Sequence, residues 1–341
     1  MRVKTVRQKR LRKVLKIPFV TSRGERRNVD NVILEIEMAD GRLILSEVPS
    51  ATTIEEMGRK EVLNKAKTEL RGLPVCLWED FVKDMRRRHP EFPLTVSALE
   101  IGLFKAMLCS KGTDPFEFFG SAISRIETDI TVPFSSWQNL ERWLEAASRD
   151  GFSTFKLKLK GDLEADLEFL SLAYRLLQTK VHGLKLRLDF NRAYDVRTFE
   201  KFLAAIEKEP YPIELLEEPT SEALTCRLAS ALPWPIFLDE SIMGREDLMR
   251  ALEGRLLSGV NIKLARTGII ESLAMVEIAK GAGLKLMIGC MMESLIGLST
   301  SVYLACGKGI FQFVDLDSIY FLHSKKEYER IRVEGPFYEV T

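Results

Sequence analysis

Short apolar runs alternate with longer segments of helical period from about residue 129 onward. The runs are rich in Val, Ile, Leu and Phe, and amphipathic helical spacing lies between most of them. Eight such repeats predict a parallel sheet closed into a (β/α)8-type barrel. The runs are Ile130–Phe134, Phe155–Leu159, Leu184–Phe190, Ile213–Leu216, Ile236–Leu238, Val260–Leu264, Leu284–Ile288 and Phe311–Val314.

An open, doubly wound sheet is the alternative arrangement of strands and helices. Such a sheet normally carries a glycine-rich phosphate-binding turn after its first strand, and the sequence has none there. The pattern therefore favours the barrel.

The first third of the chain has a different pattern. Val32–Met38 alternates apolar and polar residues, and an Ala-Asp-Gly turn separates it from Arg42–Leu45, which predicts a β-hairpin. Helical spacing follows from Thr53 to Phe118. We therefore predict an α+β capping domain over residues 1–125, completed by the tail at about 318–341, and a barrel domain over 126–317.

Composition excludes several classes of protein. The net charge of +1 argues against a large nucleic-acid-binding surface, and no long apolar window predicts a membrane span. The scattered cysteines lack a CxxC pair, which fits a cytoplasmic location. The first 27 residues are strongly basic, but recurring apolar positions favour a strand with a charged face over a nucleic-acid arm.

Carboxylates follow three neighbouring strands of the predicted barrel. Asp189 ends LDFN, Glu217 lies in LLEEP and Asp239 lies in FLDES. Active sites of such barrels lie at the carboxyl ends of the strands, so these side chains would form one acidic wall. Clustered carboxylates repel one another unless a hard cation sits among them, and oxygen ligands suit Mg²⁺.

Two lysines would face each other across the barrel mouth. Lys158 lies on the second strand and Lys263 on the sixth, four strands apart in a ring of eight. A metal-bound substrate carboxylate acidifies its α-proton, so one lysine could remove that proton while the other delivers one to the opposite face. A lysine base needs a pKa well below about 10.4, and Lys156 beside Lys158 would help to lower it.

The last predicted strand places two more acids, Asp315 and Asp317, opposite the acidic wall. They would bind a cationic group on the substrate, most simply an ammonium. A short peptide carries a carboxylate and a distant ammonium, whereas in a free amino acid both groups lie on the reacting carbon. We therefore predict epimerisation of a dipeptide.

These motifs together resemble the enolase superfamily, and within it the muconate-lactonizing-enzyme subgroup. The KxK, LDFN, LEEP, FLDES and NIKLARTG segments occur in order, and VDLD resembles the DxD motif that holds the substrate ammonium in dipeptide epimerases. The resemblance implies a modified (β/α)7β barrel, one Mg²⁺, catalytic Lys158 and Lys263, and an L-Ala-D/L-Glu or related L-Ala-L-Xaa substrate. It leaves open an N-acylamino acid racemase or an o-succinylbenzoate synthase.

The resemblance also implies substrate contacts. PFVTSRGERR resembles the mobile cap loop of L-Ala-D/L-Glu epimerases, in which Arg23 would meet a side-chain carboxylate; Thr131 and Cys290 are further candidates. Arg26, Arg27 and the ending GPFYEVT depart from the common pattern, which leaves the choice of dipeptide open. A homo-oligomer is compatible with these features. A Schiff-base barrel lyase and a non-catalytic or nucleic-acid-associated binding protein are more distant alternatives.

Overall fold

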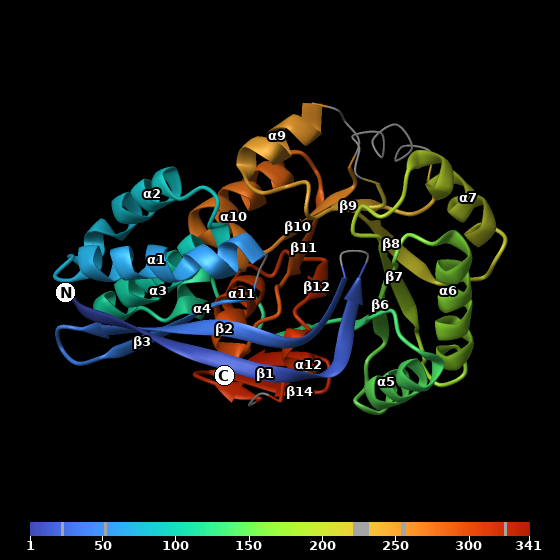
Figure 1. The fold of residues 1–341 in the computed structure, drawn as a ribbon, viewed down its shortest axis with the longest axis horizontal. Coiled ribbons are helices and arrows are strands. Elements are labelled where there is room, and N and C mark those ends of the chain that lie inside the picture. The colour runs from blue at the N-terminus through green and yellow to red at the C-terminus, as the bar shows by residue number, and fades with distance from the viewer. Residues whose placement is uncertain (22–23, 51–52, 221–231, 254–256, 324–325) are drawn as a thin grey trace.

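The computed structural model of the chain describes residues 1–21, 24–50, 53–220, 232–253, 257–323 and 326–341. It places a barrel beside a mixed α+β region built from the first part of the chain (Figure 1).

Eight parallel strands form one sheet in which spatial order follows chain order. Its first and last strands meet through the backbone, because Asp129 N donates to Val314 O at 3.2 Å. The predicted barrel, nearly closed, is therefore confirmed, with one strand on each apolar run. The strands are β5 (Ile130–Val132), β6 (Thr154–Lys158), β7 (Lys185–Asp189), β8 (Ile213–Glu217), β9 (Ile236–Leu238), β10 (Gly259–Ile262), β11 (Lys285–Gly289) and β12 (Phe313–Asp315).

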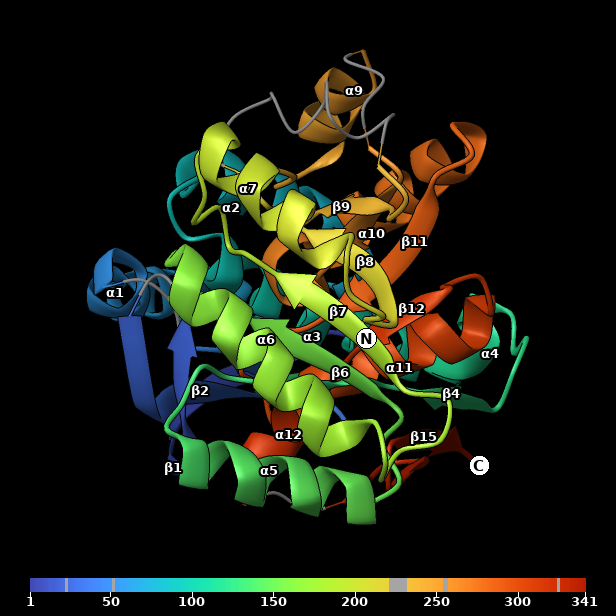
Figure 2. The same cartoon turned by 90° about the vertical axis from the view of Figure 1, so that its right-hand side faces the viewer.

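Amphipathic helices cover the outside of the barrel, and Figure 2 shows α5, α6 and α7 across the outer face of β6, β7 and β8. Aspartates begin two of these helices: Asp162 accepts from Ala165 N at 3.1 Å, and Asp195 accepts from Thr198 N at 2.8 Å. The barrel helices are α5 (Trp137–Arg149), α6 (Leu163–Leu177), α7 (Val196–Ile206), α9 (Arg245–Glu253), α10 (Leu264–Gly281) and α11 (Leu295–Lys308), followed by α12 (Ser318–Phe321).

A small apolar cluster fills the barrel below the strand ends. Leu215, Phe237, Met287 and Phe313 are all buried, and the rings of Phe237 and Phe313 pack edge to face at 4.9 Å. Side chains two residues apart on a strand share a face. The residues two positions later on these strands therefore point into the barrel above this cluster, at its carboxyl-terminal end.

The N-terminal part forms a three-stranded antiparallel sheet of β1 (Val3–Thr21), β2 (Gly24–Met38) and β3 (Leu43–Val48). The turn between β2 and β3 is closed by Gly41 N donating to Met38 O at 2.9 Å, and Gly41 has a φ of 88°, which glycine adopts without strain. The predicted hairpin is confirmed, and the basic N-terminal segment is a strand as predicted.

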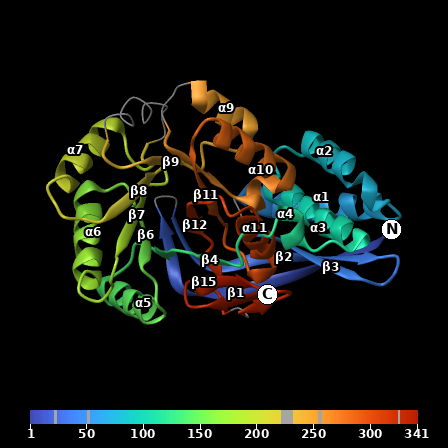
Figure 3. The ribbon, with the colours of Figure 1, turned by 180° about the vertical axis from the view of Figure 1, so that it is seen from behind.

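Helices of the N-terminal part pack beside α10 and α11, as Figure 3 shows from behind. One of them, α3, is long and apolar enough to cross a membrane by length and composition alone, but 83% of its most apolar window is buried inside the protein. The helices are α1 (Thr53–Leu70), η1 (Val75–Leu77), α2 (Trp78–Arg88), α3 (Pro93–Lys111) and α4 (Pro115–Phe119).

The C-terminal tail forms its own antiparallel sheet, in the order β13 (Glu327–Tyr328), β14 (Ile331–Glu334), β15 (Phe337–Val340) and β4 (Arg125–Glu127). It also contacts the N-terminal part, because the buried Lys105 Nζ donates to Glu329 Oε1 at 2.9 Å. The tail thus joins the segment that precedes the barrel, while the domain boundary at residue 125 stays a prediction.

Candidate active site

Three carboxylates stand at the carboxyl ends of adjacent strands. Asp189 ends β7 and Glu217 ends β8, where the two residues are paired in register, and Asp239 directly follows β9. Each is at most 1% exposed. The structure therefore brings the predicted acidic wall to one edge of the barrel.

Three lysine amines contact this wall. Lys156 Nζ lies 2.6 Å from Glu217 Oε2 and 3.3 Å from Asp189 Oδ2. Lys158, at the end of β6, forms an ion pair with Asp189. Lys263, which directly follows β10, donates through Nζ to Asp239 Oδ2 at 2.5 Å. Lys158 and Lys263 thus contact opposite ends of the wall, and Lys156 contacts its centre.

The wall and the lysines shift one another's protonation. Burial lowers the pKa of Lys263, but the surrounding carboxylates, Asp239 first among them, together outweigh burial and raise the pKa above its usual value. The pKa of Lys156 is raised in the same way, because Asp315, Glu217 and other carboxylates together outweigh its burial. Burial raises the pKa of Asp239, but Lys263, Arg266 and Lys156 together outweigh burial and lower the pKa. The sequence argument expected a lowered lysine pKa; direct contact with carboxylates produces the opposite direction.

The donor set of the wall fits a hard divalent cation. It offers only carboxylate oxygens, which suit Mg²⁺. Glu217 Oε2 is buried and accepts no hydrogen bond from the residues that the structure describes, although it faces the Lys156 ammonium. In the described part of the chain, the acids whose oxygens all lie within 4.8 Å of one another, close enough to hold a metal ion by geometry, are instead Asp129, Asp315 and Asp317.

Hydrogen bonds of two side chains, Glu218 and Asn191, tie the strand ends together behind the wall. Glu218 Oε1 accepts from Asp239 N at 2.8 Å and from Ser241 N at 2.7 Å. Asn191 Nδ2 donates to Glu240 Oε1 at 2.9 Å. Glu218 and Asn191 have φ values of 43° and 45°, which are uncommon outside glycine and are held here by these contacts. The second acid of LEEP and the Asn of LDFN therefore position the wall.

Asp315 and Asp317 lie where the first strand of the barrel, β5, meets the last strand, β12. Asp317 accepts from the backbone N–H of Thr131, and Thr131 O accepts from Trp143 Nε1 at 2.9 Å. Burial raises the pKa of the Cys290 thiol, and the nearby Asp317 and Asp315 add to this effect. The structure thus gathers Thr131 and Cys290 around the two acids, whereas Arg23 lies outside the described residues.

Sequence reasoning missed four buried polar side chains at this site. Asn261 Nδ2 donates to Glu217 Oε1 at 2.9 Å, and Arg266 pairs with Asp239 Oδ1 at 2.9 Å. Arg187 Nη1 pairs with Asp129 Oδ2 at 2.7 Å. Three of the four could have been found by the two-residue repeat of strands, since Asn261, Arg187 and Asp129 each precede a predicted site residue by two positions.

The long hairpin of β1 and β2 reaches from the N-terminal sheet to the barrel (Figure 1). Near its tip, the Phe19 ring packs edge to face on Phe321 at 5.3 Å and lies 6.0 Å from Lys158 Nζ. The hairpin therefore adds an aromatic surface beside one of the two lysines.

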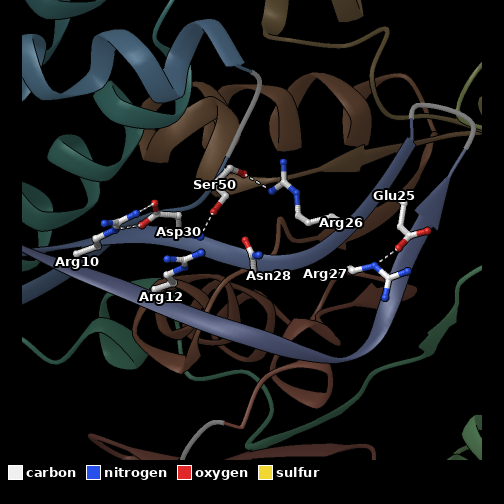
Figure 4. Close-up of a pocket in the computed structure, with 8 residues that line it drawn as sticks. All are labelled: Arg10, Arg12, Glu25, Arg26, Arg27, Asn28, Asp30 and Ser50. Carbon is white, nitrogen blue, oxygen red and sulfur yellow. Dashed lines mark hydrogen bonds and ion pairs between the residues drawn. The ribbon is translucent and has the colours of Figure 1, made fainter.

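A separate pocket of about 460 Å³ lies along this hairpin (Figure 4). Two of its arginines are paired with acids, Arg10 with Asp30 and Arg27 with Glu25. None of the wall carboxylates or lysines lines it, so we place the active site in the barrel. The pocket is lined by Arg10, Arg12, Glu25, Arg26, Arg27, Asn28, Asp30 and Ser50.

The chain is similar to known proteins over most of its length. The family described as Enolase C-terminal domain-like matches residues 139–341. The L-Ala-D/L-Glu epimerase of Thermotoga maritima is 33% identical over 250 residues, which are 72% of this chain and 71% of the relative. The aromatic dipeptide epimerase of Herpetosiphon aurantiacus is 29% identical over 312 residues, which are 89% of this chain and 86% of the relative.

A solved structure shows the same fold. The dipeptide epimerase of Enterococcus faecalis V583, complexed with Mg and the dipeptide L-Leu-L-Tyr, superposes with a TM-score of 0.88 at 24% identity, covering 100% of this chain and 98% of that one. The matched family spans more than half of the chain, and it includes seven of the eight barrel strands together with the wall and both opposed lysines. The chain therefore belongs to the enolase superfamily, in the Enolase C-terminal domain-like family.

Proposed function

We propose that this protein is a magnesium-dependent dipeptide epimerase, which inverts the α-carbon of the C-terminal residue of a dipeptide by moving a proton from one face to the other. The observation that carries the proposal is the placement of Lys158 and Lys263 at opposite ends of one buried carboxylate wall. Relatives named as dipeptide epimerases support it.

Asp189, Glu217 and Asp239 would hold the Mg²⁺. The bound cation would supply a Lewis acid that stabilises negative charge on the substrate carboxylate. Lys158 Nζ would then take or return the α-proton on one face, and Lys263 Nζ would do so on the other. Each amine must first be freed from its carboxylate, and a cation bound to the wall would weaken the attraction between the wall and these amines.

Asp315 and Asp317 would bind the α-ammonium of the substrate, which fixes the dipeptide at its other end. Lys156 would act as an auxiliary cation between the two ends, since its Nζ contacts both Glu217 and Asp315. Thr131 and Cys290 would line the space beside the ammonium. A substrate held at both ends keeps its α-carbon between the two opposed lysines.

The side chain of the epimerised residue is the less defined part of the substrate. An L-Ala-D/L-Glu dipeptide or a related L-Ala-L-Xaa is our proposal, with Arg23 binding an acidic side chain. Replacing Arg23 by Met should then reduce turnover of L-Ala-L-Glu more than that of L-Ala-L-Ala. Equal losses on the two dipeptides would remove Arg23 from substrate recognition.

A dipeptide library tests the function directly. The protein is incubated with Mg²⁺ and the library in D₂O, and mass spectrometry follows the gain of about one dalton that exchange of a single α-proton produces. Uptake by L-Ala dipeptides supports the proposal and identifies the substrate. N-acylamino acids in the same assay separate an epimerase from an N-acylamino acid racemase, and uptake by these alone would contradict a dipeptide substrate.

A further inference from the structure

The seam between β5 and β12 brings three buried aspartates together. Asp129 precedes β5, Asp315 ends β12, and Asp317 lies two residues further on. Leu316 N donates to Thr128 Oγ1 at 2.8 Å and so holds the seam closed. One oxygen of each aspartate lies within 4.8 Å of the others, and none of the three residues is more than 5% exposed.

The charges in this cluster are only partly matched. Arg187 Nη1 contacts Asp129 Oδ2 at 2.7 Å, and Lys156 Nζ contacts Asp315 Oδ2 at 2.7 Å. Asp317 has no ion pair within the described residues. It accepts a hydrogen bond from the backbone N–H of Thr131. Asp129 Oδ1 is buried and accepts no hydrogen bond from the described part of the chain. One carboxylate thus lacks a cation, and one buried acceptor lacks a donor.

A ligand that pairs with the Asp317 carboxylate and donates to Asp129 Oδ1 must carry one positive charge and several N–H donors. A primary ammonium has this chemistry. A nitrogen placed centrally among three oxygens that lie within 4.8 Å of one another is at most about 2.8 Å from each of them, which is within the reach of a charge-assisted hydrogen bond. We propose that Asp129 is the third acceptor for the substrate's α-ammonium, held in place by Arg187, and that the Asp315–Asp317 pair is one part of a three-carboxylate site.

The electrostatics of the cluster favour such a ligand. Burial and the neighbouring Asp315 raise the pKa of Asp129, and the same two causes raise the pKa of Asp317. Keeping Asp129 and Asp317 ionised therefore costs free energy, and a bound cation would lower that cost. Burying a charge-assisted hydrogen bond here also discriminates against substrates that lack the donor, because the acceptor is then left unpaired.

The inference rests on the proposed function, and the variant Asp129→Asn tests it. We expect KM for the preferred L-Ala dipeptide to rise about tenfold or more, because a hydrogen bond to a charged group is lost, while kcat changes little, because the ammonium is remote from the reacting carbon. Asp166→Asn is the matched control, since Asp166 is an equally buried aspartate outside the cluster that bonds to Lys160 N and Gly161 N.

N-methylated substrates separate binding from general damage. The N-methyl and N,N-dimethyl forms of the same dipeptide keep the charge but lose one and two N–H donors. In the wild-type protein KM should rise along this series, and the penalty of Asp129→Asn should shrink along it. An unchanged KM in the variant, or an equal rise in KM on all three substrates, would overturn the assignment of Asp129. If the variant fails to fold, the wild-type series still tests the ammonium site, because equal KM values for the three substrates would also overturn the assignment.

Two controls separate the possible failures. The Mg²⁺ concentration that gives half-maximal activity should be the same in the wild type and in Asp129→Asn; a large shift would assign the cluster to the metal and refute the ammonium site. Absence of epimerisation of every dipeptide by the wild type would refute the proposed function itself. Wild-type turnover with an unaffected variant would refute only the role of Asp129.

Discussion

Glu293 offers a test of the electrostatics around the active site. It follows β11, is 3% exposed, and accepts from Met291 N through Oε2 at 3.0 Å. Burial and the nearby Glu47 raise its pKa from 4.5 to about 8. The native state therefore holds this proton more tightly than the unfolded chain does, so the free energy of unfolding falls as the pH rises through this window.

The variant Glu293→Gln removes this titration and keeps the side-chain shape and the acceptor oxygen. A pKa displaced from 4.5 to about 8 corresponds to a loss of up to about 5 kcal/mol of stability between the two values. We expect wild type and variant to differ little at pH 4.5. At pH 8.5 the variant should have gained several kcal/mol relative to the wild type.

Equilibrium denaturation in guanidinium chloride at a series of pH values, with a chelator present, measures this difference. Glu277→Gln is the control, because the Glu277 side chain is 67% exposed. A stability difference between wild type and Glu293→Gln that stays constant from pH 4.5 to 8.5 would refute the reasoning.

Four other variants test the site and the fold. Lys158→Ala and Lys263→Ala should each reduce epimerisation by about 10³-fold, yet each should still exchange the α-proton of one epimer with D₂O, seen by NMR; exchange of both epimers would contradict two opposed bases. In Gly289→Ala the new Cβ would lie 2.4 Å from Asn261 Oδ1 and 2.8 Å from Lys263 Cε, so kcat should fall with little change in circular dichroism, and an unchanged kcat would contradict that contact. Glu47→Ala should lower the free energy of unfolding by about 2–4 kcal/mol, because the buried Glu47 accepts hydrogen bonds from backbone N–H groups at the start of α11. A loss below about 0.5 kcal/mol in denaturant titrations would show that these hydrogen bonds add little to stability.

The barrel could be predicted because its signals are local. Each apolar run is a buried parallel strand, and such strands read as continuous hydrophobic segments. The polar residue that ends a run, such as Asp189 or Glu217, necessarily lies at the carboxyl edge of the sheet. The neighbourhood of these residues follows from strand order alone, which here equals chain order.

Other parts of the site could not be predicted from local pattern. The two-residue repeat of strands places Arg187 on the same face as Asp189, but it does not give the partner of Arg187, which is Asp129, 58 residues earlier in the chain. The direction of the lysine pKa shifts also depended on contacts, because burial and carboxylates act in opposite directions and distance decides the balance. The tail is a similar case, since its strands pair with Arg125–Glu127, far away in the sequence.

The amino-acid sequence by itself determined the order of strands and helices and the chemistry available at each strand end, because backbone periodicity and side-chain type are properties of short segments. Tertiary structure decided which amine contacts which carboxylate, which buried acceptors are left without donors, and how far the N-terminal hairpin reaches over the barrel. These depend on distances between residues far apart in the chain, and electrostatic and hydrogen-bond energies change steeply with such distances.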